Sequence, residues 1–188
     1  MIKKFLFLLS LWCSQVVADN TLEVLIPREE IHQKIVEYAD KINQEYKGKE
    51  LTIVMIMKGA FVFVADFMRE LKEPAAIEYI RCSSYSSDTV RGELSVYGLD
   101  LLDLRGKDVL LMDDIIDTGH TMNTVVQMIE SMEPASLRTC VLLSKTARRE
   151  VDYQPDDYLF HIENHFVSGY GLDGGELGRG LPDVCYYK

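Results

Sequence analysis

The chain has 188 residues, of which 47% are hydrophobic and 27% are charged, and its formal net charge is −10. This is the composition of one ordinary globular domain with a sizeable core, and a second full domain would not fit comfortably in this length. The acidic balance, without a basic stripe in the sequence, excludes nucleic acid as an expected partner. Any bound phosphate must therefore be held by a few placed cations, by backbone dipoles and by a metal ion.

The first eighteen residues differ from everything that follows. Two lysines precede an apolar stretch from Phe5 to Trp12, and Ala18 stands where a signal peptidase would cut. The stretch is too short for a comfortable membrane span, so no stable membrane association is expected. We therefore separate residues 1–18, a signal-like segment, from one domain over residues 19–188.

Beyond this segment, apolar runs typical of buried strands alternate with helical patterns, which predicts an α/β fold with a central parallel sheet flanked by helices. An amphipathic helix begins at Pro27, and its apolar face carries Ile31, Ile35, Tyr38, Ala39 and Ile42. Next along the chain we expect a strand from Leu51 to Met57, a helix from Ala60 to Leu71, and strands from Ala76 to Cys82 and from Leu94 to Tyr97. A strand from Lys107 to Met112, a helix from Met122 to Met132 and a strand from Arg138 to Leu143 follow.

Two stretches break this alternation. Residues 83–92 are polar and rich in Ser, Asp and Gly, which is the composition of a loop. Beyond Pro155 the apolar runs become short, and the Gly-rich stretch from Gly169 to Gly180 lies among them. The short runs, which predict a small antiparallel lobe, are Tyr158 to His161, His165 to Val167 and Val184 to Tyr187.

The most informative stretch runs from Val109 to Thr121 and reads VLLMDDIIDTGHT. Its apolar residues suit a strand buried on both faces, which places the acids at the carboxyl end of the strand, where open α/β sheets bind ligands. Asp113 and Asp114 repel each other unless a cation or donors lie near them, and Mg²⁺ or sugar hydroxyls meet that need. The turn that enters the next helix is expected to cradle a phosphate group. The residues of this turn are Thr118, Gly119, His120 and Thr121.

A simpler interpretation of the same acids is that Asp113 and Asp114 end a strand and that Asp117 caps the helix. For a single Asp that interpretation would be preferred. For the whole string we favour a ligand site, because two Ile residues between acids waste apolar surface unless the loop is held for a purpose.

The string resembles the phosphoribosyl pyrophosphate (PRPP) binding motif of type I phosphoribosyltransferases. The best match is the hypoxanthine-guanine phosphoribosyltransferase family, and the resemblance covers roughly Leu22 to Lys188. The family's other signatures occur in order: Met57-Lys58-Gly59, Ser84-Tyr85, Lys145, Phe166-Val167 followed by Asp173, and Arg179. Five signatures in the right order and spacing are specific, and they imply the type I phosphoribosyltransferase fold with a small hood lobe.

The resemblance also implies a reaction. The 5-phosphoribosyl group of PRPP is transferred, with Mg²⁺, to N9 of hypoxanthine or guanine, which gives IMP or GMP and pyrophosphate. Asp113 and Asp114 would contact the ribose hydroxyls directly or through Mg²⁺, and Asp173 resembles the ligand of a second Mg²⁺. Asp117 would face N7 of the purine and act as the general base.

For the leaving pyrophosphate, the resemblance implies binding at Lys58 and Gly59, with a cis peptide bond between Met57 and Lys58, and a second cation at Arg179. Ser84 and Tyr85 would belong to a loop that closes over the reacting atoms.

For the base, Lys145 would donate to O6, which selects 6-oxopurines over adenine. Phe166 would stack on the ring, and the backbone of Val167 would read its edge. Without the family, Phe166 could equally be a core residue and Lys145 a solvated helix start.

Three questions stay open at this point. A PRPP- or nucleotide-binding regulator without turnover is the alternative function, although the acidic charge and the intact acids favour an enzyme. Relatives form dimers or tetramers, so a homodimer or homotetramer is expected. We expect the cytoplasm, because PRPP is a cytosolic metabolite and Cys82, Cys140 and Cys185 lack a disulfide framework; export is the alternative if residues 1–18 are a functional signal.

Overall fold

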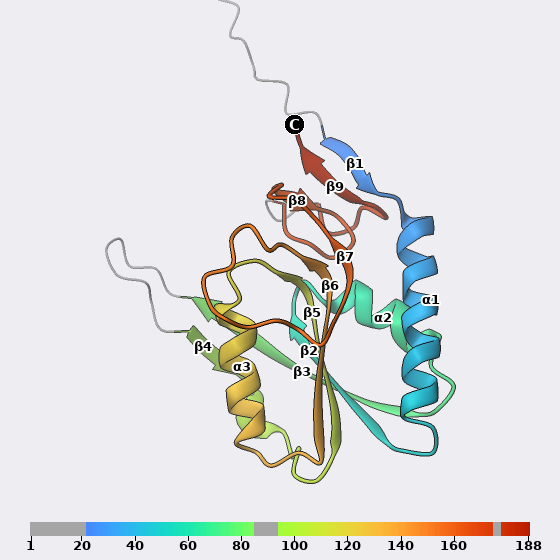
Figure 1. Ribbon diagram of the computed structural model, residues 1–188, viewed down its shortest axis with the longest axis vertical. Coiled ribbons are helices and arrows are strands. Elements are labelled where there is room, and N and C mark those ends of the chain that lie inside the picture. Colours follow the sequence, from blue (N-terminus) through green and yellow to red (C-terminus); the bar gives the residue numbers. More distant parts are fainter. Residues whose placement is uncertain (1–21, 85–93, 175–177) are drawn as a thin grey trace, which may run out of the picture.

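A computed structural model describes residues 22–84, 94–174 and 178–188 (Figure 1). The expected signal-like segment and Tyr85 lie outside these residues. Within them, no helix is both long enough and apolar enough to cross a membrane.

The centre of the molecule is a six-stranded sheet in the order β4-β3-β2-β5-β6-β7. All neighbouring strands are parallel except β3 and β4, which form an antiparallel pair at one edge. The strands are β2 (Leu51–Met57), β3 (Ala75–Ser84), β4 (Leu94–Tyr97), β5 (Asp108–Ile116), β6 (Ser136–Ser144) and β7 (Asp157–His161). The predicted parallel α/β architecture is confirmed.

Helices cover both faces of this sheet. The helices α1 (Arg28–Glu45) and α2 (Phe61–Arg69) lie on one face, and α3 (His120–Glu130) lies on the other (Figure 1). Successive side chains of β5 point to alternate faces of the sheet. Leu110 and Met112 belong to the core under α1 and α2, whereas Val109 and Leu111 belong to the core under α3. Burial on both faces explains the continuous apolar run. All five predicted inward residues of α1 are buried.

A second, three-stranded antiparallel sheet forms the predicted small lobe above the main sheet (Figure 1). Its order is β1-β9-β8, with β1 at Leu22–Ile26, β8 at Val167–Ser168 and β9 at Val184–Tyr187. The strand β1 was not predicted. The assignment of Tyr158 to His161 to this lobe was wrong, because β7 pairs in parallel with β6 in the main sheet.

The central strand is longer than predicted. It continues through Asp113 and Asp114 to Ile116 instead of stopping at Met112. Ile116 is 2% exposed in the core under α3, and Ile115 packs against the opposite core. The expectation that these isoleucines waste apolar surface was therefore wrong, because each of them packs into one of the two cores.

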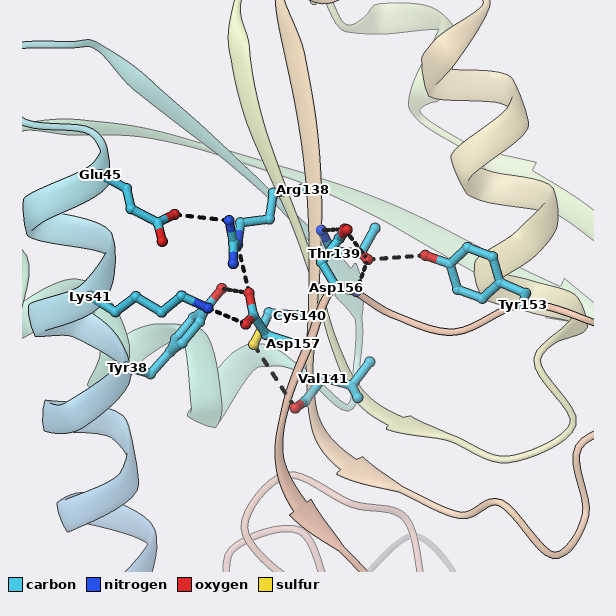
Figure 2. A network of polar contacts seen from close by, with 10 residues as sticks. All are labelled: Tyr38, Lys41, Glu45, Arg138, Thr139, Cys140, Val141, Tyr153, Asp156 and Asp157. Atoms are coloured by element: carbon cyan, nitrogen blue, oxygen red, sulfur yellow. Dashed lines mark hydrogen bonds and ion pairs between the residues drawn. The ribbon is translucent and has the colours of Figure 1, made fainter.

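A polar network ties α1 to the edge of the main sheet (Figure 2). Asp157, at the start of β7, accepts hydrogen bonds from Lys41 (2.5 Å), Arg138 (2.6 Å) and Tyr38 (3.3 Å). Arg138 also pairs with Glu45 at 2.8 Å. Burial alone would raise the pKa of Asp157, but the bonds from Arg138 and Lys41 outweigh it and hold the pKa below its usual value.

We expect Asp157→Asn to lower the free energy of unfolding by about 1–3 kcal/mol, because it weakens three bonds to a half-buried charge. A lowered native pKa stabilises the fold above the unfolded pKa, and this stabilisation is lost as the pH falls through the native value. The difference in free energy of unfolding between the wild type and the variant, measured by urea unfolding, should therefore become smaller in acid. Asp152→Asn, at an exposed acid nearby, is the control, and an equal loss in both variants would contradict this role of Asp157.

Candidate active site

Two adjacent carboxylates lie near the carboxyl end of the central strand. Because neighbouring residues of a strand point to opposite faces, Asp113 lies on the α3 side and Asp114 on the side of α1 and α2. Asp113 is 8% exposed, and its Oδ1 accepts a hydrogen bond from the amide of Asp114 at 2.9 Å. Burial raises the pKa of both groups, and for Asp113 the charge of Asp114 raises it further. The pair thus favours a cation or hydrogen-bond donors beside it.

The loop after β2 lies directly against Asp114. A Cβ atom on Gly59 would lie 1.8 Å from Oδ2 of Asp114, so only glycine fits at this position with the carboxylate where it is. The Met57–Lys58 peptide bond is cis, as predicted, and Lys58 is exposed. The β2–α2 loop and the acidic pair, which are far apart in sequence, therefore form one rim.

The predicted phosphate turn has a shape suited to an anion. Gly119 has φ +90°, a left-handed conformation that favours glycine, and it is the N-cap of α3, without a side-chain capping bond. The alternative in which Asp117 caps this helix is therefore wrong. A small cavity of about 120 Å³ lies here, lined by Asp113, Ile115, Ile116, Asp117, Thr118, Gly119, Thr121 and Met122. The start of α3 offers backbone N–H groups and a positive dipole end at this cavity.

A second pocket of about 390 Å³ opens on the other side of the strand end. Its lining residues are Asp114, Ile115, Asp117, Lys145, Arg148, Asn164, His165, Phe166, Val167, Leu172 and Asp173. Asp117 lines both cavities, so it stands between the phosphate turn and this pocket. The structure thus brings together six of the predicted site residues in one pocket.

The two oxygens of Asp117 have different surroundings. Oδ2 lies 3.2 Å from a guanidinium nitrogen of Arg148 and 3.8 Å from Nζ of Lys145. Oδ1 is shielded from solvent and accepts no hydrogen bond from the described residues. Such an unsatisfied acceptor costs about 1–3 kcal/mol, which a donor on a bound ligand would offset. Burial lowers the pKa of Lys145, and the charge of Asp117 opposes that effect.

The aromatic side of the pocket comes from the small lobe. Phe166 is 64% exposed, and its ring centroid lies 5.9 Å from that of Tyr187. The next residue, Val167, is buried at the start of β8. An exposed ring beside a buried strand is placed to stack on a flat ligand, so Phe166 is not the core residue that its type alone would suggest.

The remaining predicted residues lie around the rim. Arg179 donates to Oδ2 of Asp173 and to the carbonyl of Gly171, both at 2.6 Å, and its charge opposes the rise in the pKa of Asp114. Arg179 lines another cavity of about 670 Å³ rather than the pocket with Lys145. Ser84 is the last residue of β3.

Sequence reasoning missed Arg148, which follows Lys145 by three residues and lines the same pocket. The sequence does show two adjacent arginines, Arg148 and Arg149, in the loop after a strand. Their contact with Asp117 could not be predicted, because it depends on the fold. Asn164 and Leu172 were also missed, and their residue types carry no signal.

The acids fit a magnesium ion that is held mainly by its substrate. No cluster of three or more His, Cys, Asp or Glu side chains able to hold a metal occurs among the described residues. Mg²⁺ usually takes one or two carboxylates and completes its octahedron with water and substrate phosphates. Asp113 and Asp114 supply such hard oxygen donors; neither forms an ion pair with the described residues, and a bound ion would offset the cost of their burial.

We expect Asp113→Asn to raise the free energy of unfolding of the ligand-free protein by about 1–2 kcal/mol at neutral pH, because it removes a buried charge and keeps the bond from Asp114. Because the native pKa is raised, the carboxyl group destabilises the fold increasingly as the pH rises from the unfolded pKa to the native pKa, and it does not do so below both values. The gain should therefore disappear in acid. Unfolding with a chelator present tests this, with the exposed Asp100→Asn as control, and a clear loss of stability would contradict it.

Comparison of the chain with known proteins agrees with this geometry. Residues 27–174 match the model of the phosphoribosyl transferase domain. The hypoxanthine phosphoribosyltransferase of Salmonella typhimurium is 41% identical over 169 residues (88% of this chain and 94% of the relative), and the hypoxanthine-guanine phosphoribosyltransferase of Aquifex aeolicus is 40% identical over 174 residues (89% and 96%). The Trypanosoma cruzi hypoxanthine phosphoribosyltransferase, solved with its product IMP, has a TM-score of 0.81 at 35% identity and covers 88% of this chain and 94% of its own. The chain belongs to the phosphoribosyltransferase family, within its hypoxanthine-guanine branch.

Proposed function

We propose that this protein is a magnesium-dependent hypoxanthine-guanine phosphoribosyltransferase of purine salvage. It transfers the 5-phosphoribosyl group of PRPP to N9 of hypoxanthine or guanine and releases pyrophosphate, which gives IMP or GMP. The observation that carries this proposal is the position of Asp117 between an anion-binding turn and a pocket that also holds Lys145 and Phe166. A nucleotide has the same plan, with a phosphate at one end and a base at the other.

In this proposal the sugar lies over the acidic pair. Breakage of the bond between C1′ and pyrophosphate leaves positive charge on the ribose ring, so the ring must be held and water excluded. Asp113 and Asp114 hold the 2′ and 3′ hydroxyls, and the turn of Thr118, Gly119, His120 and Thr121 holds the 5′-phosphate through its amides. Mg²⁺, when bound, would neutralise charge on the pyrophosphate. Asp113 and Asp114 are the proposed protein ligands of one ion, and Asp173 is the proposed ligand of a second.

The purine occupies the pocket of about 390 Å³. Oδ1 of Asp117, which accepts no hydrogen bond from the described residues, takes the proton from N7 as N9 attacks C1′. Lys145 donates to O6, Phe166 stacks on the ring and the backbone of Val167 reads its edge. A 6-amino group would place its donors against the donor Lys145, which disfavours adenine.

Pyrophosphate leaves on the opposite side of the sugar. Lys58, the amide of Gly59 and Arg179 receive it, the guanidinium fork of Arg179 matching phosphate oxygens. Ser84 and Tyr85 are further proposed substrate contacts, of which Tyr85 lies outside the described residues.

We further propose that residues 19–188 act as one catalytic domain in a homodimer or homotetramer in the cytoplasm, where PRPP is made. A candidate contact surface is the larger cavity of about 670 Å³ between α1, α2 and the small lobe, which includes the partly exposed Phe61 and Leu181. Exposed apolar groups of this kind are common in subunit interfaces.

In the deciding experiment, the purified protein is incubated with PRPP, Mg²⁺ and, in separate reactions, hypoxanthine, guanine, xanthine or adenine. The formation of nucleotide and pyrophosphate is then measured. We expect turnover with hypoxanthine or guanine, no turnover with adenine, and loss of activity with a chelator. Absence of nucleotide with all four bases would overturn the enzyme proposal, and binding of PRPP without turnover would favour the regulator.

We expect Asp117→Asn to lower kcat by about 10²-fold or more, because the amide cannot take the N7 proton. Binding of IMP should change little, since the amide keeps the size of the carboxylate and an acceptor oxygen. Steady-state rates and calorimetry with IMP test both statements. Asp103→Asn, at an exposed acid outside the pocket, should keep the wild-type rate; an unchanged rate for Asp117→Asn would remove the general-base role.

A further inference from the structure

The segment of residues 148–151 lies directly on the phosphate turn. The amide of Glu150 donates to the carbonyl of Thr118 at 3.0 Å, and the Glu150 carboxylate lies 3.1 Å from Nε2 of His120. A Cβ atom on Gly119 would lie 2.8 Å from a methyl group of Val151. The loop that follows the proposed O6 donor is thus joined to the turn that holds the phosphate.

Arg149 connects the residues on either side of this loop to Asp117. Its Nε donates to the carbonyl of Asp117 at 3.2 Å, and its terminal nitrogens donate to the carbonyls of Lys145 (3.2 Å) and Tyr153 (2.6 Å) and to the hydroxyl of Ser144 (3.4 Å). One planar guanidinium therefore fixes the backbone of both Asp117 and Lys145. A lysine ammonium could not reproduce this fork of bonds.

Arg148 acts on the side chain of the same aspartate. Its guanidinium donates to Oδ2 of Asp117 at 3.2 Å, whereas Oδ1 has no partner among the described residues. The side chain of Arg148 is 52% exposed. An ion pair with that exposure adds at most about 1 kcal/mol to stability, so its main effect is to fix the orientation of the carboxylate.

We propose that Arg148 and Arg149 form an arginine clamp that positions Asp117 for proton transfer. The proposal rests on the proposed function. Arg149 sets the backbone of Asp117 relative to Lys145, and Arg148 holds Oδ2, which leaves Oδ1 as the oxygen that meets N7 of the purine. Neither arginine takes part in the chemistry; each acts through Asp117.

The test measures kcat, KM for PRPP and thermal midpoint for Arg148→Met, Arg149→Met and Arg149→Lys. We expect kcat for hypoxanthine to fall about tenfold to a hundredfold in both Met variants, because small misplacements of a catalytic group are costly. KM for PRPP should stay within about twofold, since the amides of the turn remain. Arg149→Lys, which keeps the charge but not the fork, should behave like Arg149→Met.

The control is Arg105→Met. Arg105 is an exposed arginine in the loop before β5, and it forms an ion pair with Glu133 at 2.8 Å. The substitution removes a surface ion pair that is more exposed than the pair of Arg148 with Asp117, and it should leave kcat and KM unchanged. The midpoint of Arg148→Met should match that of Arg105→Met, which separates the effect on rate from any effect on folding.

A double-mutant cycle gives the decisive readout. In the Asp117→Asn background, Arg148→Met should lower the residual kcat by less than about twofold, because the group that it positions no longer takes a proton. An equal loss in both backgrounds, or wild-type kcat in Arg148→Met and Arg149→Met, would overturn the clamp. These results require an active wild-type protein, whereas failure of the proposed function would show as a wild type inactive with every base.

Discussion

The structure depends on two neighbouring carboxylates, Asp113 buried and Asp114 partly exposed, near the end of a strand that helices cover on both faces. β5 is the central strand, covered by α1 and α2 on one side and by α3 on the other, and Asp113 and Asp114 continue its alternation. Burial raises the pKa of both carboxyls, so the ligand-free protein holds an acidic pair that water solvates poorly. The same low polarity that makes the pair unfavourable strengthens its bonds to a sugar or cation.

The strand also explains why the site has two compartments. Because Asp113 and Asp114 point to opposite faces, Asp113 borders the small cavity at the phosphate turn. Asp114 borders the pocket of about 390 Å³ that also contains Lys145 and Phe166. A ligand that reaches both must pass over the end of the strand. The loop at Gly59 lies against Asp114 at this end of the strand, and the absence of a side chain on Gly59 lets the two segments approach.

Local pattern predicted much of this arrangement. The bounds of β2, β4 and β9 agree with the apolar runs, and the acids and the glycine of the turn were found because neighbouring residues carry that signal. The failures have one cause. β1 was missed because β9, its strand partner among the described residues, lies about 160 residues away, and β7 was misassigned because its pairing with β6 depends on the long-range order of the sheet. The contact of Arg148 with Asp117 spans 31 residues and was missed for the same reason.

That missed contact bears on how Asp117 would act as the proposed general base. A carboxylate at the end of a strand can rotate, and either oxygen could face the purine. With Oδ2 beside Arg148 and Lys145, the two oxygens are no longer equivalent. Oδ1 has no hydrogen-bond partner among the described residues, so a substrate proton could bind to it without breaking an existing hydrogen bond. A base held in this way is oriented by contacts on one oxygen and would react through the other. The reactivity of Asp117 therefore depends on the loop after Lys145 as much as on the strand that carries the acid.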